Sequence, residues 1–314
     1  MVLLLQYTLI FASVLMLVAL GGCFAERSGV INIGLEGIMV IGALGGALVM
    51  KFLPVSAGVL PMVAITVLAS ALFGMMFSLF LAVAAISFKA DQTITGTAMN
   101  MLATAGATVA VKAMNTLASG GNDVSSDISY THAKDLFIVR LGQFEFNWFM
   151  LVAALCLVIS YVALYKTKFG LRLRSCGEHP QASASVGINV LKMRYSGVLI
   201  SGLLGGLGGI VYITAGVSLW KFENGVAGFG FLAMAVMIFG GWHPLRIALA
   251  ALLFGFLRAL GNVYSGFDLL MMLNIPSVVY NMLPYIISLV VLAFTSKNSR
   301  APKAAGIPYD RGTR

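Results

Sequence analysis

Amide, hydroxyl and carboxylate side chains interrupt the apolar stretches of this sequence at two places, and these side chains are the ones best suited to contact a solute. Asn32 and Glu36 lie in a glycine-containing segment before a long apolar stretch. Gln92, Thr95 and Asn100 lie at the start of another. Uncharged groups that donate and accept hydrogen bonds suit a neutral polar solute. They equally suit hydrogen bonds between neighbouring helices, so both interpretations stay open.

Glu36 is the most costly of these residues to place in a membrane. Insertion scales give about 2.5–3.5 kcal/mol for an aspartate at a helix centre. Such carboxylates usually face the protein interior and serve function. Two other interpretations are a salt bridge with Arg27 and a carboxylate at a helix N-terminus, where the helix dipole favours it.

Motifs for catalysis are missing from the sequence. It has no G-x-x-x-x-G-K-[ST], no H-E-x-x-H and no G-x-S-x-G, and its three histidines are scattered among loops. We therefore expect no enzyme activity, no metal site and no bound cofactor. Active transport would draw its energy from a separate ATPase or from an ion gradient.

The composition requires a membrane around much of this chain. Of its 314 residues, 60% are hydrophobic and 10% are charged, and the mean hydropathy is +0.96. Soluble domains are about 45–50% apolar and about 25% charged. The apolar stretches are continuous rather than alternating, which favours helices over a β-barrel. We predict an all-α polytopic membrane protein.

About nine spans, with eight to ten allowed, fit the apolar stretches when each needs roughly 20 residues. They are 2–24, 36–53, 59–88, 92–113, 146–165, 195–217, 229–241, 245–263 and 276–295. The third is long enough to be one tilted helix or two shorter ones around Pro61.

Charge assigns the sides of the membrane, because short loops rich in Lys and Arg stay in the cytoplasm. Such residues crowd the loop 166–194 and the tail 296–314, whereas the segment 114–145 is rich in acidic residues. We expect a transmembrane domain over 1–295 with an external loop at 114–145. These basic loops account for the net charge of +9 without any nucleic-acid partner.

Glycine is frequent and patterned. The pairs Gly42/Gly46, Gly202/Gly206 and Gly205/Gly209 have the spacing that lets helices approach closely in lipid. The segments 26–37 and 223–230 both read Gly-Val, two residues, a large apolar residue and Gly. Because the predicted topology gives them opposite directions, we interpret them as interrupted helices of an inverted repeat that flank a solute path.

The three cysteines predict no disulfide framework, and Cys23 and Cys156 lie in apolar stretches typical of buried thiols. The residues before Cys23 resemble a lipoprotein cleavage box. The apolar stretch there lacks the basic region of a secretory signal, which argues against lipid attachment.

The basic loop contains a predicted short helix. Pro180 suits a first helical turn and Gly187 suits a stop, so residues 180–186 are expected to form a helix on the inner face of the membrane. An ordinary basic loop is the alternative.

Several segments together resemble one transporter family. Residues 28–37, with the sequence SGVINIGLEG, resemble the signature of ABC importer permeases of the branched-chain amino acid and ribose group. More narrowly, they resemble its branch for nucleosides, riboflavin and simple sugars. The loop 167–188, the run 228–230 and the run 240–244 resemble further family segments, so that the resemblance spans roughly residues 20–295.

The resemblance implies a permease paired with a second related permease, two ATP-binding subunits and a lipid-anchored solute-binding protein in a bacterial inner membrane. It implies that the loop 178–188 contacts the ATPase. The coupling residues carried over are Gly177, Glu178, His179, Pro180, Ala182, Ser183 and Gly187. His179 stands where the family commonly has Asn, which leaves details of that contact open.

The cargo is the least determined feature. The branch implies a nucleoside-like or riboflavin-like solute, with simple sugars as the alternative. Phe229, Phe222 and Trp220 could stack on a heteroaromatic ring, although interfacial or lipid-facing positions are the commoner role of aromatics. A stand-alone transporter coupled to ions through Glu36 or Asp91 is the competing class.

Overall fold

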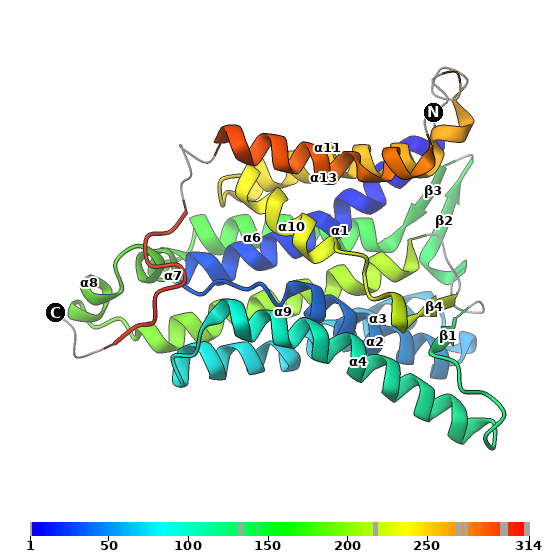
Figure 1. Ribbon diagram of the computed structural model, residues 1–314, viewed down its shortest axis with the longest axis horizontal. Helices are drawn as coiled ribbons and strands as arrows, with labels where there is room; N and C mark the ends of the chain where they lie inside the picture. The colour runs from blue at the N-terminus through cyan, green and yellow to red at the C-terminus, as the bar shows by residue number, and fades with distance from the viewer. Residues whose placement is uncertain are drawn as a thin grey trace.

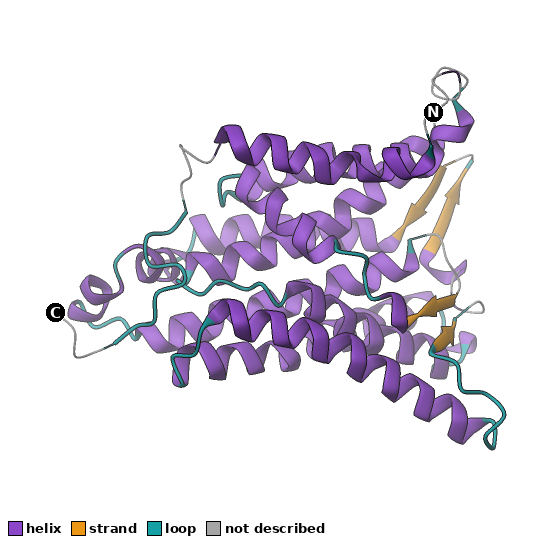
Figure 2. Ribbon diagram, in the orientation of Figure 1, coloured by secondary structure: helices purple, strands orange, loops and turns teal. Residues whose placement is uncertain are grey.

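The computed structural model describes residues 2–130, 133, 135–142, 144–215, 219–267, 272, 276–295 and 301–310. Apolar helices dominate this part of the chain (Figures 1 and 2). They are α1 (Val2–Arg27), α2 (Leu35–Phe52), α3 (Val59–Ala82), α4 (Gln92–Ala118), α6 (Trp148–Tyr165), α9 (Val190–Thr214), α10 (Phe229–Phe239), α11 (Pro244–Val263) and α13 (Ser277–Thr295).

Each predicted span coincides with one of these helices. Within the described residues, seven are long and apolar enough to cross a membrane, while α10 and the apolar part of α13 are shorter. The prediction of an all-α polytopic membrane protein is confirmed. The count of nine spans stays a prediction, because the 11 residues of α10 measure about 16 Å at 1.5 Å per residue and cannot cross alone.

The long third stretch is a single helix. α3 begins at Val59, so Pro61 lies in its first turn, where a missing backbone amide costs no helical hydrogen bond. A π-helical turn over Val83–Ser87 continues α3 at its other end. The alternative of two shorter helices around Pro61 is therefore wrong.

The two ends of the bundle differ in structure. At one end, β1 (Asp127–Ser129) pairs with β4 (Leu219–Lys221), and β2 (Ile138–Leu141) pairs with β3 (Phe144–Asn147). At the other end lie α7 (Lys168–Glu178), α8 (Pro180–Ser185) and the tail residues 301–310 (Figure 1). Residues 296–300 and 311–314 of the predicted tail lie outside the described residues. Charge remains the basis for assigning the α7–α8 end to the cytoplasm.

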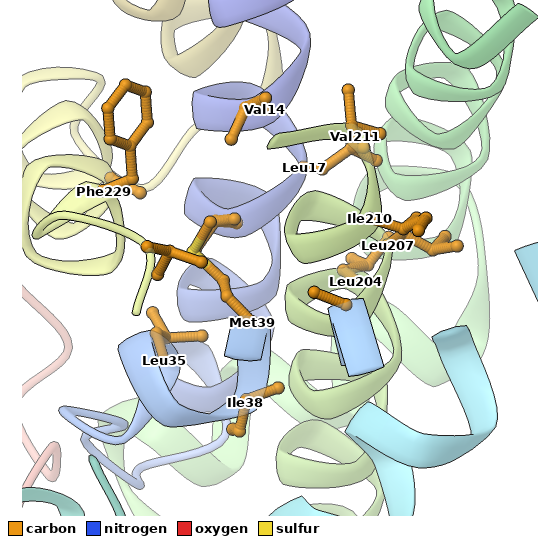
Figure 3. Packing of buried hydrophobic residues seen from close by; sticks show 14 of the residues in the cluster. Val14, Leu17, Leu35, Ile38, Met39, Leu204, Leu207, Ile210, Val211 and Phe229 are labelled. Atoms are coloured by element: carbon orange, nitrogen blue, oxygen red, sulfur yellow. The ribbon is translucent and has the colours of Figure 1, made fainter. Parts of the chain in front are cut away.

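The core forms where α1, α2, α3 and α9 pack closely through small residues. Figure 3 shows buried side chains of α1, α2 and α9, among them Leu17, Met39 and Leu204. A Cβ added at Gly209 would collide with the carbonyl oxygen of Met39, and one added at Gly42 would collide with Gly206. The glycine pairs are thus close-contact positions between helices, as predicted.

Two details of the predicted boundaries are wrong. α9 begins at Val190 instead of 195, because the Asn189 side chain accepts a hydrogen bond from the Lys192 amide and caps the helix. Lys192 and Arg194 therefore belong to the helix and not to the basic loop, and Arg194 is buried. The first span also ends later than predicted, because α1 continues to Arg27 instead of ending at residue 24. Cys23 is buried inside this helix.

Candidate functional site

Two segments of irregular backbone lead into the bundle interior. The first, residues 28–34, joins α1 to α2 and is here called the interior break; the second, residues 222–228, precedes α10. Gly29 and Gly225 occupy matching positions, with φ of +97° and +56°, values that favour glycine. Val30 and Val226, the residues that follow them, are both buried. The short sequence match therefore corresponds to a shared feature of structure, a glycine with positive φ followed by a buried valine.

The two segments enter from opposite ends of the molecule. α2 runs from the end near Arg27 to the end where Lys51 hydrogen-bonds Asn115. α10 starts beyond Lys221, which pairs with Asp127 at the strand-bearing end, and finishes beside Arg27 (Figure 1). Helices of opposite direction that begin after irregular segments inside a bundle are typical of transporter solute paths.

The N-termini of α2 and α10 meet at Glu36. Its two carboxylate oxygens each accept a hydrogen bond of 2.7 Å, one from the Gly228 amide and one from the Gly230 amide. Glu36 also lies in the first turn of α2, so it faces the positive ends of two helix dipoles. Of the earlier interpretations, the N-terminal carboxylate is confirmed, whereas Arg27 pairs with Glu178 at 3.7 Å rather than with Glu36.

The amide side chains of α4 satisfy the backbone of the interior break. The Gln92 Oε1 accepts a hydrogen bond of 2.7 Å from the Ile31 amide. Asn100 accepts one of 2.8 Å from the Gly37 amide and donates one of 3.0 Å to the Ile33 carbonyl. In lipid, irregular backbone needs such partners within the protein. Both residues therefore have a structural role in this conformation.

The remaining predicted pathway residues have different surroundings. Asn32 is 1% exposed and donates to the Ser201 hydroxyl at 2.9 Å. Thr95 is half-buried and donates to the backbone carbonyl of Asp91. Phe229 is fully buried, with its ring centroid 4.5 Å from that of Tyr212. Asn32, Glu36, Gln92 and Asn100 thus gather at the interior break, and Phe229 lies at the adjoining start of α10.

Two buried polar atoms keep unused hydrogen-bonding capacity at this place. The Oδ1 of Asn32 and the Nε2 of Gln92 have no partner within the described residues. One is an acceptor and the other a donor. Of the other two aromatic residues considered for ring stacking, Phe222 is buried, and Trp220 packs edge-on against Tyr212 with ring centroids 5.4 Å apart.

A polar cluster missed by the sequence analysis joins this region to the α7–α8 end. The Trp242 indole donates to Glu26 at 2.6 Å, and the Trp242 carbonyl accepts hydrogen bonds from the Arg27 guanidinium. Arg27 also pairs with Glu178. The adjacent charges at the end of the first span and the Gly-Gly-Trp turn were the signals available in the sequence.

The loop 166–194 contains the predicted short helix. α8 begins at Pro180, and Gly187 follows it with φ of +83°, so this prediction is confirmed. The predicted coupling residues divide into two sets. Glu178, His179 and Ala182 line a groove of about 540 Å³. Gly177 and Pro180 are buried and do not line it, and Gly177 packs against the Arg27 backbone; Ser183 is buried but still lines the groove.

Metal or nucleophilic chemistry finds little support in this arrangement. Across the described ranges, no group of three or more His, Cys, Asp or Glu residues is placed to hold a metal ion. Asp91 is an ordinary helix cap, since its side chain accepts hydrogen bonds from the Thr93 and Ile94 amides.

The comparisons identify the family. Residues 4–294 match the family model described as the branched-chain amino acid transport system permease component. The chain belongs to this family of transport permeases. The resemblance read from the residues 28–37 and the loop 167–188 is confirmed.

Relatives of this permease cover nearly its whole length. It is 43% identical over 311 residues to the guanosine ABC transporter permease protein NupQ of Bacillus subtilis (strain 168), covering 98% of this chain and 96% of that protein. It is 38% identical over 307 residues to the nucleoside ABC transporter permease protein NupC of Lactococcus lactis subsp. cremoris (strain MG1363), covering 96% and 94%. The NupB permease of that organism is 25% identical over 259 residues, covering 78% and 68%. No solved structure matches the chain.

These findings give the permease its coarse role. It is a multi-pass membrane subunit of an ABC importer, and its family implies an ATPase and a solute-binding partner. The family and the relatives are transport permeases and not enzymes.

Proposed function

We propose that this permease carries nucleosides, with purine nucleosides as the first candidates, across a bacterial cytoplasmic membrane. The single observation behind this cargo is the 43% and 38% identity, over nearly the whole chain, to permeases named for guanosine and for nucleosides. ATP would be bound and hydrolysed by a separate subunit, and the permease itself would need no cofactor. A riboflavin-like cargo has no comparable support.

The geometry at Glu36 favours an uncharged solute. Exposed helix N-termini attract anions, since their amides and dipoles are positive. Here the carboxylate of Glu36 already accepts hydrogen bonds from Gly228 and Gly230 at the start of α10. An anionic solute would have to displace it. A neutral nucleoside needs only donors and acceptors, such as the unused atoms of Asn32 and Gln92.

The partners follow from the family and from the relatives. NupC and NupB are two permeases of one organism, which supports pairing of this chain with a second, related permease. A lipid-anchored binding protein would deliver the solute at the strand-bearing end. The ATPase would dock at the α7–α8 end, in contact with the groove lined by His179 and Ala182.

The coupling would run from this docking surface to the interior break. A push on α8 moves Glu178, which pairs with Arg27, and Arg27 holds the Trp242 carbonyl at the end of α10. Because Arg27 is also the last residue of α1, the same contact reaches the interior break. The helices α2 and α10 would thus both respond to one movement.

The test is uptake of radiolabelled guanosine by vesicles that contain the complete importer. The chain is co-expressed with the ATPase, second permease and binding protein encoded beside its gene. We expect uptake that requires ATP, persists when ionophores collapse all ion gradients, and is competed by other nucleosides. A catalytically inactive ATPase is the control. Uptake abolished by ionophores would point to an ion-coupled transporter, and competition by sugars instead of nucleosides would replace the cargo.

A further inference from the structure

The C-terminal residues 301–310, here called the C-terminal strap, lie across the α7–α8 end of the bundle (red in Figure 1). The Ala304 amide donates a hydrogen bond of 2.8 Å to the Gly177 carbonyl at the end of α7. Asp310 pairs with Lys89 at 3.0 Å, in the connection between α3 and α4. The end of α7 and the connection between α3 and α4, which are far apart in the sequence, therefore both contact this short segment.

Tyr309 anchors the C-terminal strap in an apolar cluster. Its side chain is 8% exposed and packs in a small cluster with Cys176 of α7 and Val190 of α9. Lys303 in the same strap is exposed. Burial of a tyrosine ring is a large apolar contribution for a segment of this length, so the strap is held by packing as well as by hydrogen bonds.

Arg194 connects the C-terminal strap to the interior break. The guanidinium is 1% exposed, donates to the Ile307 carbonyl at 2.9 Å and lies over the Tyr309 ring at 5.9 Å. On its other side, a Cβ added at Gly29 would come within 2.8 Å of the guanidinium. A buried cation is costly unless it is well partnered. Among the described residues its Nε and Nη2 have no partner, so the Ile307 carbonyl is an important contact.

The C-terminal strap also contacts the interior break directly. A Cβ added at Gly306, whose φ is +80°, would lie 2.9 Å from the side chain of Ile31. The Ile31 amide is the one that binds Gln92. The C-terminal strap thus contacts the α7–α8 end at Gly177 and the interior break at Ile31.

We propose that the C-terminal strap is a positioning element that fixes the α7–α8 loop to the interior break, with Arg194 as its positioning residue. It rests on the proposed function, because it assigns the strap a part in transmitting ATPase movement. Transmission between two sites requires a physical element that contacts both. The Gly177, Arg194 and Ile31 contacts meet that requirement.

Cys176 provides a native reporter of strap docking. The thiol is fully buried beside Tyr309, and burial raises its pKa, so that it is both covered and un-ionised while the strap is docked. Thiolates, not thiols, react with maleimides. Undocking would expose Cys176 and return its pKa towards the ordinary range.

The experiment compares Tyr309→Ala with the controls Tyr309→Phe and Lys303→Ala. Membranes are treated with N-ethylmaleimide, and modification of Cys176 is followed by peptide mass spectrometry. We expect roughly tenfold faster modification in Tyr309→Ala and wild-type rates in both controls. In the complete importer, the same variant should keep ATP hydrolysis and lose uptake, which lowers the amount of nucleoside moved per ATP.

Unchanged modification of Cys176 in Tyr309→Ala would overturn the docking of the strap. Faster modification with an unchanged ratio of uptake to hydrolysis would overturn its role in transmission. If Tyr309→Ala does not accumulate in membranes, truncation after Arg300 provides the second variant for both measurements. The modification assay needs neither cargo nor ATP. If the wild-type importer takes up no nucleoside, the proposed cargo is contradicted. The modification assay still decides whether the strap is docked.

Discussion

The carboxylate of Glu36 and the backbone amide of Gly230 are 2.7 Å apart, and this contact joins the start of α2 to the start of α10. The two helices enter from opposite ends, and neither has an N-terminal side-chain cap of its own. One acidic side chain supplies the missing acceptors for α10 while lying in the first turn of α2. The contact therefore holds the N-terminal ends of α2 and α10 together inside the bundle.

Replacing Glu36 should weaken this junction. Glu36→Ala removes two hydrogen bonds to a charged acceptor, each contributing about 1.5–3 kcal/mol. Glu36→Gln keeps one acceptor but turns an amide donor towards a backbone N–H. We expect both variants to reach the membrane, to lose thermal stability in detergent and to lower uptake, with Ala the more severe. Glu223→Gln is the matched control, since Glu223 forms a solvent-screened surface ion pair with Lys112. Normal uptake by Glu36→Ala would reduce Glu36 to a dispensable contact.

Replacing Asn100 should destabilise the protein more than replacing Thr97, which lies about one turn earlier on α4. Asn100→Leu leaves the Gly37 amide and the Ile33 carbonyl without side-chain partners, at about 1–3 kcal/mol for each buried group. Thr97→Ala removes only a hydroxyl bonded to the Thr93 carbonyl of its own helix, and its side chain is exposed. We expect a clear drop in melting temperature for Asn100→Leu and almost none for Thr97→Ala. Equal melting temperatures would contradict the assignment of Asn100 to the interior break.

Close helix packing gives a test with glycine. Gly209→Ala would place a methyl group against the Met39 carbonyl, which forces α2 and α9 apart. Gly106→Ala on α4 meets nothing within 4 Å and should be neutral or slightly stabilising, since alanine favours a helix over glycine by about 1 kcal/mol. The amount of folded protein recovered by size-exclusion chromatography measures both. Recovery of Gly209→Ala at the wild-type level would mean that the two helices need not approach so closely.

Cysteine crosslinking tests the docking surface. Ala182 is exposed at the groove, whereas Ser183, the next residue, lines the groove but is only 4% exposed. We expect Ala182→Cys to crosslink to a cysteine on the co-expressed ATPase and Ser183→Cys to remain unlinked. Crosslinking at Ser183 alone, with transport intact, would show that α8 presents its other face to the partner.

His243 should make stability depend on pH. Burial, and then the nearby Arg246 and Arg27, lower the pKa of His243 below its ordinary value of about 6.5. Because the unfolded chain then takes up the proton first, folded stability is fully present above about pH 6.5 and falls as the pH drops through the folded pKa. As the pH is lowered from about 8 to about 5, the melting temperature should fall less for His243→Gln than for the wild type. Parallel curves for the two would contradict the lowered pKa.

Much of the architecture could be predicted because it depends on local chemistry. Each predicted span became a helix, since a continuous apolar stretch in lipid has to satisfy its own backbone. The short helix at Pro180 and its stop at Gly187 followed from the conformational preferences of two residue types. The match between Gly29 and Gly225 was visible for the same reason.

Partners across long sequence separations could not be predicted in this way. Glu36 could serve function in the interior, pair with Arg27 or lie at a helix N-terminus, and only the fold brought it to Gly228 and Gly230, more than 190 residues away. The sequence left Gln92 and Asn100 open to solute contact or to hydrogen bonds within the protein, and the fold shows both residues hydrogen-bonded to the interior break.

Taken alone, the sequence determined that the protein is helical, which segments form its apolar helices, and which transporter family it resembles. These properties follow from composition, periodicity and short motifs, each confined to neighbouring residues. The tertiary structure decided which helix ends meet, which polar groups are already paired, and that residues 301–310 lie between the α7–α8 loop and the interior break. The physical reason is that hydrogen bonds and close packing depend on distances in space, and one polar side chain has many possible partners until the fold selects one.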